Sequence, residues 1–538
     1  MARSISERVQ VWLFKAVTGV LFVLFRLLSP RRSALLSRNK LPPVGNPALL
    51  RSATQLAKKI RRKEVSSVEA VQAYIDRIQE VNPLLNALVK DRFDAALQEA
   101  AQADRLINGK PGEQEEEEEA ALEERLPLLG VPLSVKESFA LQGMPLSIGL
   151  VSRKGIVSTA DCPAVALLRR AGAIPLGVTN LPVLCMWFES HNRLYGVTNN
   201  PYDLGRTPGG SSGGEASLIA AAGSVVGVGS DIGGSIRMPS FFNGIFGHKP
   251  TPGVVSLDDT YPRCTGREME YNSIGPLCRY AEDLLPMLRI MAGPNVGMLS
   301  LNTKVDLQKL RFFTVPHNSG CIMMSPVSKE LFDVQKKVVE RLEADLGVEV
   351  REVRFPELRY SFQIWDTYMG LPDKEGKPPR AFTELLGEPG RPVRPLWELL
   401  KWTVGKSQHT MAALVLVLLS YVCRPFKPSS DFIQREKEKL QRELEELLGA
   451  DGVFLYPSHP RVAPEHHHPL FRPFDFGYTG IFNILGLPVT QCPLGLGEEG
   501  LPLGVQVVAG KMQDHLSLEV ALYLEKTFGG WRDPGTKK

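Results

Sequence analysis

Two serines and one lysine stand where a hydrolytic enzyme could use them. Ser211 lies in the run GGSSGG, and Ser235 lies in DIGGS, a second glycine turn further along the chain. Lys136 closes an apolar stretch, LPLLGVPLSVK, well before either serine. Serine is a weak nucleophile until a neighbouring base takes its proton. The three residues therefore predict acyl-transfer chemistry if the fold brings a base to one of the serines.

Two catalytic schemes fit these residues. In the first, Gly209 to Gly213 matches the G-x-S-x-G elbow of α/β-hydrolases, with Ser211 as nucleophile and a later histidine as base. An elbow needs a strand running into the serine, but residues 199–208 have the composition of a loop. The second scheme uses Lys136, Ser211 and Ser235 together. Burial on an apolar strand would lower the lysine pKa, as a lysine base requires.

Helices and strands alternate around these residues. A buried strand is predicted over 126–139, a helix over 160–171 and a strand over 173–178. A helix at 215–222 and a strand at 225–228 join the two glycine turns. This alternation predicts an α/β architecture with a largely parallel sheet.

The second half of the chain continues the same pattern. Helices are expected at 278–291, 329–346 and 431–448, strands at 310–315, 348–353 and 453–457, and the last helix and strand at 478–488 and 503–509. The apolar segment 397–423 is different, because its uninterrupted run MAALVLVLL is too short to span a bilayer. It predicts either a buried core helix or a cap that contacts the membrane or lines a lipid-sized pocket.

An apolar run near the N-terminus predicts a membrane anchor helix at 9–28, followed by a linker at 29–47. A signal peptide and an amphipathic surface helix are the alternatives, but no small-residue cleavage site follows the run. More basic residues follow the run than precede it, which places the rest of the chain in the cytosol. Residues 48–531 then form one large domain, with a catalytic core at about 126–260.

Composition excludes several classes of function. A net charge of +4 over 538 residues gives no reason to expect a nucleic-acid partner. Seven cysteines without a C-x-x-C pair predict reduced thiols. The glutamate run 115–119 and the histidines 466–468 lack metal-ligand spacing, so both are interpreted as solvated loops. Neither a metal nor a cofactor is expected.

The motifs as a whole resemble the amidase signature family. The resemblance rests on VPLSVKE, GGSSGG and DIGGSIR and extends through GAIPLGVTN, GHKPTPGVVS and GLPVTQCPLG, over about residues 50–531. Within that family the N-terminal apolar run and LEKTFGGW are most similar to vertebrate fatty-acid amide hydrolases. The resemblance implies a single α/β domain whose mixed, twisted sheet is surrounded by helices.

The resemblance also implies a role for each site residue. Ser235 would be the acylated nucleophile, Ser211 a proton relay next to a cis peptide bond, and Lys136 the base. Backbone N–H groups would form the oxyanion hole, at Ile232, Gly233, Gly234 and Ser235. A supporting polar network would come from Ser212, Asp231 and Arg237. Apolar substrate contacts would come from Met186, Trp187 and Phe188.

The implied reaction is the hydrolysis of fatty-acid amides, such as oleamide and N-acylethanolamines, to a fatty acid and an amine. Such an enzyme would act at a membrane or lipid-droplet surface, on the endoplasmic reticulum or on lipid droplets. The alternatives are an esterase that uses Ser211 and a histidine, a catalytically silent scaffold, and the amidase subunit of a transamidation assembly on glutaminyl-tRNA. The near-neutral charge argues against the last. The sequence permits a monomer or a homodimer and ranks neither acyl chains nor amines.

Overall fold

A computed structural model describes residues 40–108, 115–315, 323–388, 390–422 and 428–536. The anchor predicted at 9–28 and residues 29–39 of the predicted linker lie outside these ranges. Within them, no helix combines the length and the apolar character needed to cross a bilayer.

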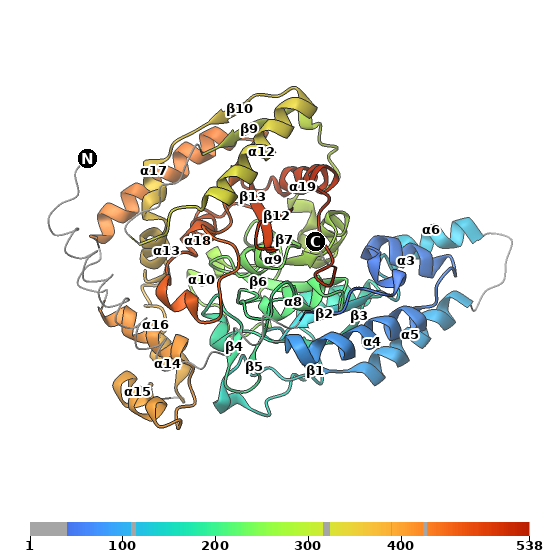
Figure 1. Cartoon of the computed structure of the whole chain (residues 1–538), viewed down its shortest axis with the longest axis horizontal. Coiled ribbons are helices and arrows are strands. Elements are labelled where there is room, and N and C mark those ends of the chain that lie inside the picture. Colours follow the sequence, from blue (N-terminus) through green and yellow to red (C-terminus); the bar gives the residue numbers. More distant parts are fainter. Residues whose placement is uncertain (1–39, 109–114, 316–322, 389, 423–427, 537–538) are drawn as a thin grey trace.

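An 11-stranded sheet runs through the domain in the order β1-β3-β2-β6-β8-β7-β12-β13-β11-β9-β10 (Figure 1). Its strands are β1 (Leu88–Asp91), β2 (Pro132–Lys136), β3 (Ile174–Thr179), β6 (Val226–Asp231), β7 (Phe246–Lys249), β8 (Ser273–Cys278), β9 (Arg311–Thr314), β10 (Val350–Glu352), β11 (Gly452–Tyr456), β12 (Val489–Leu496) and β13 (Pro502–Ala509). A separate two-stranded sheet pairs β4 (His191–Asn192) with β5 (Gly196–Val197).

The main sheet is mixed, as the family resemblance implied, and the expectation of a largely parallel sheet is wrong. Strand β2 pairs in parallel with β3 and β6. From β6 onward the neighbours β8, β7, β12, β13 and β11 pair antiparallel. The tight hairpin between β12 and β13 explains part of this difference, because only antiparallel strands can be joined so closely.

Helices enclose the sheet at both ends and on its faces (Figure 1). They are α3 (Ala53–Arg61), α4 (Ser67–Leu85), α5 (Phe93–Asn108), α6 (Glu115–Arg125), α7 (Pro163–Arg170), α8 (Gly213–Ala220), α9 (Arg237–Phe242), α10 (Glu268–Tyr271), α11 (Leu284–Ala292), α12 (Lys329–Leu346), α13 (Ser361–Met369), α14 (Phe382–Leu386), α15 (Pro395–Thr403), α16 (Met411–Val422), α17 (Ser430–Leu448), α18 (Gly477–Ile484) and α19 (Asp514–Phe528). Figure 1 places α3 to α6 beyond the β1 end of the sheet, and α14 to α16 together at a corner of the molecule.

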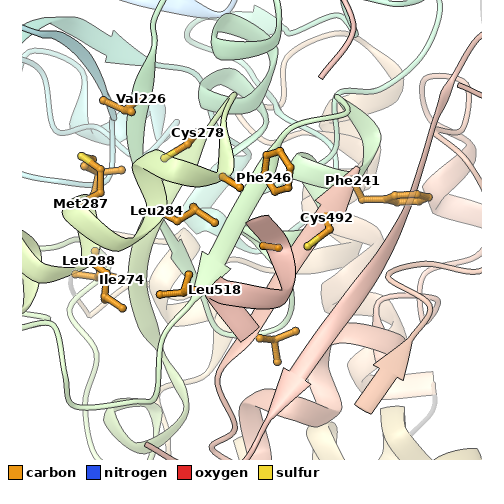
Figure 2. Packing of buried hydrophobic residues seen from close by; sticks show 14 of the residues in the cluster. Val226, Phe241, Phe246, Ile274, Cys278, Leu284, Met287, Leu288, Cys492 and Leu518 are labelled. Carbon is orange, nitrogen blue, oxygen red and sulfur yellow. The ribbon is translucent and has the colours of Figure 1, made fainter. Parts of the chain in front are cut away.

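The core beneath the central strands is apolar and buried. Val226 on β6, Ile274 on β8 and Phe246 on β7 are each at most 1% exposed. Figure 2 shows them beside Leu284 of α11 and Leu518 of α19, the two helices that cover this part of the sheet. Each such side chain contributes about 1.5–3 kcal/mol through burial. The strands that carry the site residues are therefore held on a rigid support.

Several sequence-based boundaries need correction. The helix expected over 278–291 does not begin at Cys278, because Cys278 is the last residue of strand β8. Helix α11 begins at Leu284. The strand expected over 126–139 is shorter, because residues 127–130 turn before β2 starts. The described part of the apolar segment, residues 397–422, forms two helices, α15 and α16, separated where Gly405 takes a positive φ of 72°.

Two further expectations are wrong. The glutamate run at 115–119 begins helix α6 rather than forming a loop, since acidic residues stabilise a helix N-terminus. Glu119 also pairs with Arg62 at 2.8 Å, just after α3. The elements predicted as the last helix and strand, α18 and β13, are followed by helix α19.

Candidate active site

Lys136 is the last residue of β2, with β3 and β6 hydrogen-bonded on either side. It is fully buried, and its Nζ lies 2.7 Å from Ser211 Oγ and 3.0 Å from Ser230 Oγ. Burial lowers the pKa of Lys136, although nearby Cys185 and Asp231 oppose that shift. The lysine is thus placed to be a base toward Ser211.

Ser211 sits in the glycine turn that leads into α8. The peptide bond between Gly210 and Ser211 is cis, as the resemblance implied. The turn needs glycine for close packing, because a Cβ on Gly214 would lie 2.5 Å from both the N and O atoms of Asn180. This packing brings the first turn of α8 against the residue that follows β3, and so brings Ser211 to the end of β2.

Ser235 follows β6 in the second glycine turn. The Ser212 N–H donates a hydrogen bond of 3.1 Å to the Ser235 carbonyl oxygen, which ties the two turns together. Ser235 is 8% exposed, whereas Ser211 is 1% exposed. The two turns therefore bring both serines into one site, and Ser235 is the more accessible of the two.

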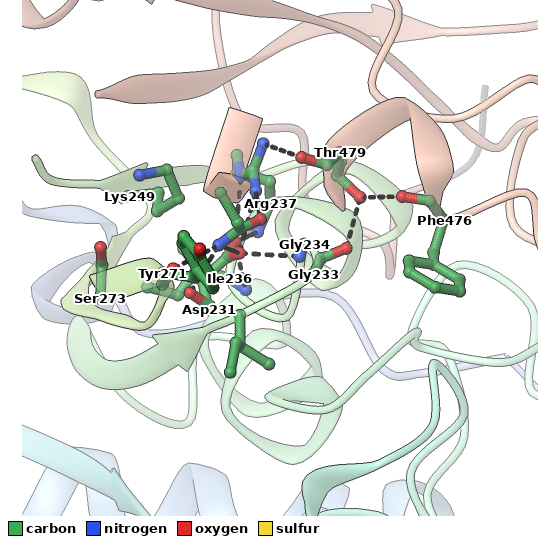
Figure 3. Close-up of polar contacts among 12 residues, drawn as sticks. Asp231, Gly233, Gly234, Ile236, Arg237, Lys249, Tyr271, Ser273, Phe476 and Thr479 are labelled. Atoms are coloured by element: carbon green, nitrogen blue, oxygen red, sulfur yellow. Dashed lines mark hydrogen bonds and ion pairs between the residues drawn. The ribbon is translucent and has the colours of Figure 1, made fainter. Parts of the chain in front are cut away.

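A buried ion pair braces the second turn (Figure 3). Asp231 and Arg237 are both completely buried, and Arg237 Nη2 lies 2.9 Å from Asp231 Oδ1. Burial alone would raise the pKa of Asp231, but Arg237 outweighs burial and holds that pKa below its usual value. The other Arg237 hydrogen bonds reach the carbonyl of Thr479 and the side chains of Asn483 and Gln506. Asp231 and Arg237 therefore fix the turn to α18 and β13, whereas the hydroxyl of Ser212, the third predicted supporting residue, is buried without a hydrogen-bond partner among the described residues.

Two carbonyl groups of the same turn are also held. Thr479 Oγ1 donates to the Gly233 carbonyl at 2.7 Å, and Trp365 Nε1 donates to the Ile232 carbonyl at 2.8 Å. The N–H of Gly234 donates to Asp231 Oδ1 at 2.7 Å, so it is occupied within the turn. The orientation of these peptide groups is thus set by neighbours before any substrate arrives.

A cavity of about 230 Å³ is lined mainly by apolar side chains, and its lining residues Trp187 and Glu189 belong to the segment that packs against Gly210. Lys136, Ser211 and Ser235 do not line this cavity. Met186 and Trp187 line it together with Met411 and Leu416 of α16. Phe188 stacks on Trp187 with ring centroids 5.0 Å apart, in a cluster that also includes Met238, three positions after Ser235. The three predicted substrate residues are therefore brought together, although Phe188 does not line the cavity itself.

Sequence reasoning missed several residues of the site. Ser230 is a neighbour of Lys136, and its only signal was its place directly before Asp231 on the strand leading to the second turn. Thr479 and Asn483 carry no signal in the sequence, because they are more than 240 positions from the turn they brace. Glu189 is another such residue, a buried carboxylate that contacts His466 and His467.

The histidine run 466–468 is only partly the solvated loop that was expected: the His468 side chain is 46% exposed, whereas the His466 side chain is buried. The side chain of His466 is only 8% exposed, and its ring contacts Glu189, Asn199 and the Leu204 carbonyl. Among the described residues, no group of His, Cys, Asp and Glu side chains is arranged to hold a metal ion. The histidines act in packing and hydrogen bonding instead.

Comparison with known proteins identifies the class. Residues 69–518 match the amidase family, and the chain belongs to it. It is accordingly an enzyme of the amide-hydrolysing class.

Its similarity to particular relatives is high. The chain is 64% identical to fatty-acid amide hydrolase 2-A of Danio rerio, and the match covers 99% of each chain. It is 51% identical to fatty-acid amide hydrolase 2 of Homo sapiens, over 99% of this chain and 100% of that protein. A solved structure described as fatty acid amide hydrolase shares the fold, with a TM-score of 0.72, 22% identity, and coverage of 94% of this chain and 91% of that one.

Proposed function

We propose that this amidase hydrolyses fatty-acid amides through an acyl-enzyme on Ser235, with Ser211 as proton relay and Lys136 as base. The observation that carries the proposal is the 2.7 Å contact between Lys136 Nζ and Ser211 Oγ in a fully buried setting. No strand leads into Ser211, since β5 ends at Val197 and a loop follows, so the hydrolase elbow is disfavoured. The Ser–Ser–Lys scheme fits both glycine turns.

The proton path has two directions. In acylation, neutral Lys136 takes the Ser211 proton while Ser211 takes the proton of Ser235, whose oxygen attacks the amide carbon. The same relay, run backwards, protonates the amide nitrogen as its bond to carbon breaks, because an unprotonated amine leaves poorly. Water then attacks the acyl-enzyme by the same route and releases the fatty acid.

Backbone donors stabilise the tetrahedral intermediate. Since the Gly234 N–H already serves Asp231, the N–H groups of Ile232, Gly233 and Ser235 are the donors for the oxyanion. One such donor contributes about 3 kcal/mol to lowering the barrier. The hydrogen bonds from Thr479 and Trp365 to the turn support its preorganisation.

The cavity supports a lipid substrate. Its walls are mainly apolar and come from Met186, Trp187 and helix α16, and its cluster continues to Met238 near Ser235. The names of the full-length relatives indicate fatty-acid amides. We therefore assign oleamide-like primary amides and N-acylethanolamines as substrates, with the acyl chain in this cavity.

Membrane attachment follows from the same substrate class. Helix α15 and its C-cap residue expose four apolar side chains at 55% or more, namely Leu396, Trp397, Leu400 and Val404. An exposed apolar patch of this kind is typical of a membrane or protein interaction site. Together with the apolar run at 9–28, it supports an enzyme that takes its substrate from the endoplasmic reticulum or a lipid droplet, with the catalytic domain in the cytosol.

The test is labelling of the purified full-length protein with a lipid-like fluorophosphonate, followed by peptide mapping. Label on Ser235, abolished by Ser235→Ala and strongly slowed by Lys136→Ala, is the expected result. Oleamide should be hydrolysed by the wild type and not by Ser235→Ala. Label on Ser211 would restore the elbow scheme, and a folded wild type that neither labels nor turns over oleamide would refute the proposal.

A further inference from the structure

A buried carboxylate belongs to the segment whose main chain packs against Gly210, the residue before the relay serine. Glu189 is 2% exposed and accepts hydrogen bonds from the His467 backbone N–H at 2.9 Å and from His466 Nδ1 at 3.1 Å. The His467 ring faces the other carboxylate oxygen, with His467 Nδ1 3.6 Å from Glu189 Oε2. Burial alone would raise the pKa of Glu189, but the two histidines hold it well below its usual value. Glu189 is therefore an anion.

Both ring nitrogens of His466 make hydrogen-bond contacts. Its Nδ1 faces the Glu189 carboxylate, and its Nε2 lies 3.0 Å from Asn199 Oδ1 and 3.3 Å from the Leu204 carbonyl. The Asn199 amide cannot be reversed without loss, because its Nδ2 donates to the Leu84 carbonyl at 2.7 Å. The His466 ring therefore joins the Glu189 carboxylate to Asn199 and to the Leu204 carbonyl.

The segment that carries Glu189 supports the Ser211 turn. A Cβ on Gly210 would lie 2.7 Å from the Trp187 carbonyl oxygen and 3.0 Å from the Glu189 nitrogen, so the two main chains are in contact. The next residue, Ser190, donates from its Oγ to the Gly209 carbonyl at 3.0 Å and accepts from the Gly213 N–H at 3.1 Å. Ser190 thus holds the turn on both sides of Ser211.

The histidine loop holds the same turn from the other direction. The Thr207 N–H donates to the Pro464 carbonyl at 2.9 Å, and the His466 N–H donates to the Gly205 carbonyl at 3.2 Å. The Glu189–His466 pair connects this loop to the segment 187–190. The Ser211 turn therefore rests on two segments that are joined through this one buried pair.

We infer that Glu189 and His466 are positioning residues for the relay: their hydrogen bond sets the place of Ser211 between Lys136 and Ser235. Neither side chain touches the reacting atoms. The pair acts through segment 187–190 and the glycine turn. This inference rests on the proposed function, because it assigns the pair to the relay that the function requires. A displacement of about 1 Å at a catalytic group can slow a reaction about a hundredfold.

Replacing the carboxylate with its neutral isostere tests the inference. In Glu189→Gln the side chain keeps its shape but loses its charge and offers an N–H where the histidines also donate. We expect kcat for oleamide and the fluorophosphonate labelling rate of Ser235 to fall by at least about tenfold, with KM unchanged. A KM that rises while the labelling rate stays at the wild-type value would overturn the inference, because Glu189 also lines the cavity.

A second variant tests whether the pair acts as a unit. His466→Gln should slow labelling about as much as Glu189→Gln, and the double variant should be no slower than either single variant, since residues in one hydrogen-bonded pair are not additive. Losses that multiply in the double variant would contradict a shared mechanism.

The matched control is another buried histidine–carboxylate pair. His248 Nε2 lies 3.2 Å from Asp514 Oδ1, both side chains are fully buried, and the pair joins β7 to α19. Asp514→Asn should lower the thermal midpoint and leave the labelling rate of the folded enzyme unchanged. If Asp514→Asn slows labelling as much as Glu189→Gln, the effect is general destabilisation. A wild type that fails to label Ser235 refutes the proposed function instead, so the two failures are distinguishable.

Discussion

The two hydroxyl groups around Lys136 determine where its lone pair points. A neutral lysine has two N–H donors and one acceptor site. If Ser230 Oγ accepts one N–H at 3.0 Å, the lone pair is free to take the proton of Ser211 at 2.7 Å. Ser230 then orients the base without taking part in proton transfer.

Removing that hydroxyl should slow acylation. Losing one hydrogen bond of about 1–1.5 kcal/mol predicts that Ser230→Ala labels with fluorophosphonate about tenfold more slowly. Thermal stability should stay near the wild-type value. Ser256→Ala is the control, because Ser256 bonds only its neighbour Asp258 at the surface. Equal labelling rates for Ser230→Ala and wild type would show that Lys136 is oriented without Ser230.

The pH dependence of acylation should report on Lys136. The lysine works only when neutral, so labelling should be slow at low pH and rise as the pH passes its pKa. Burial lowers that pKa, so the rise should come at lower pH than for an ordinary lysine, whose pKa is about 10.4. Labelling rates measured across pH for wild type and Lys136→Ala test this expectation. A rise that persists in the variant would assign the titration to another group.

At the scale of elements, helix α15 connects the outside of the molecule to the cavity. Its outer side chains Leu400 and Val404 are 56% and 63% exposed, whereas Trp402 on the same helix lines the cavity. Helix α15 therefore carries exposed apolar side chains on one side and contributes to a mainly apolar cavity on the other, which suits an apolar substrate.

Introducing carboxylates on the exposed side of α15 should slow the hydrolysis of a substrate held in a bilayer and leave the catalytic step itself unchanged. We expect Leu400→Glu with Val404→Glu to lower kcat/KM for oleamide in phosphatidylcholine vesicles several-fold, because carboxylates are costly at a bilayer. Hydrolysis of a water-soluble short-chain amide should not change. Leu106→Glu on α5, at a residue 49% exposed, is the matched control. Equal losses for both substrates would place the effect at the catalytic residues.

The sequence predicted the site well where residues close in the chain make it. The glycine turns at Ser211 and Ser235 share one local motif with α8 and β6, and the lysine lies on the adjacent strand β2. The sequence-based prediction failed where contacting residues are far apart in the chain. The residues around His466 have the composition of a loop, and the sequence gives no sign that Glu189, 277 positions away, is its buried partner. The prediction that a helix begins at Cys278 failed for another reason. A short apolar run can belong to a buried strand or to a helix, and periodicity alone does not separate the two.

At the scale of the whole molecule, a buried acid links stability to pH. Glu215 is fully buried on α8 beside Ser134, and burial raises its pKa to about 8. A carboxyl whose pKa is raised on folding stabilises the fold fully below its unfolded pKa of about 4.3. That contribution is lost as the pH rises through about 8. The wild type should therefore become less stable over this range.

Glu215→Gln isolates this contribution. Glutamine cannot ionise, so the unfolding free energy of the variant should fall less between about pH 5 and about pH 9, by on the order of a few kcal/mol. Urea unfolding at the two pH values measures it. Burial also raises the pKa of other acids such as Glu137, which changes stability with pH in the same direction. These acids are present in both proteins, so their contributions cancel in the comparison. An identical pH dependence in the two proteins would show that folding does not raise the pKa of Glu215.

The hydrogen-bond partners of Arg237 lie so late in the chain that they bear on when the Ser235 turn is completed during synthesis. Its hydrogen-bond partners at Thr479, Asn483 and Gln506 lie 242 to 269 positions later in the chain. A chain under synthesis on the ribosome carries Lys136 and both serines for most of its elongation, yet the turn around Ser235 gains these supports only near the end. Translation thus acts as a timer: the Ser235 turn stays without these three supports until the polypeptide has been made past Gln506.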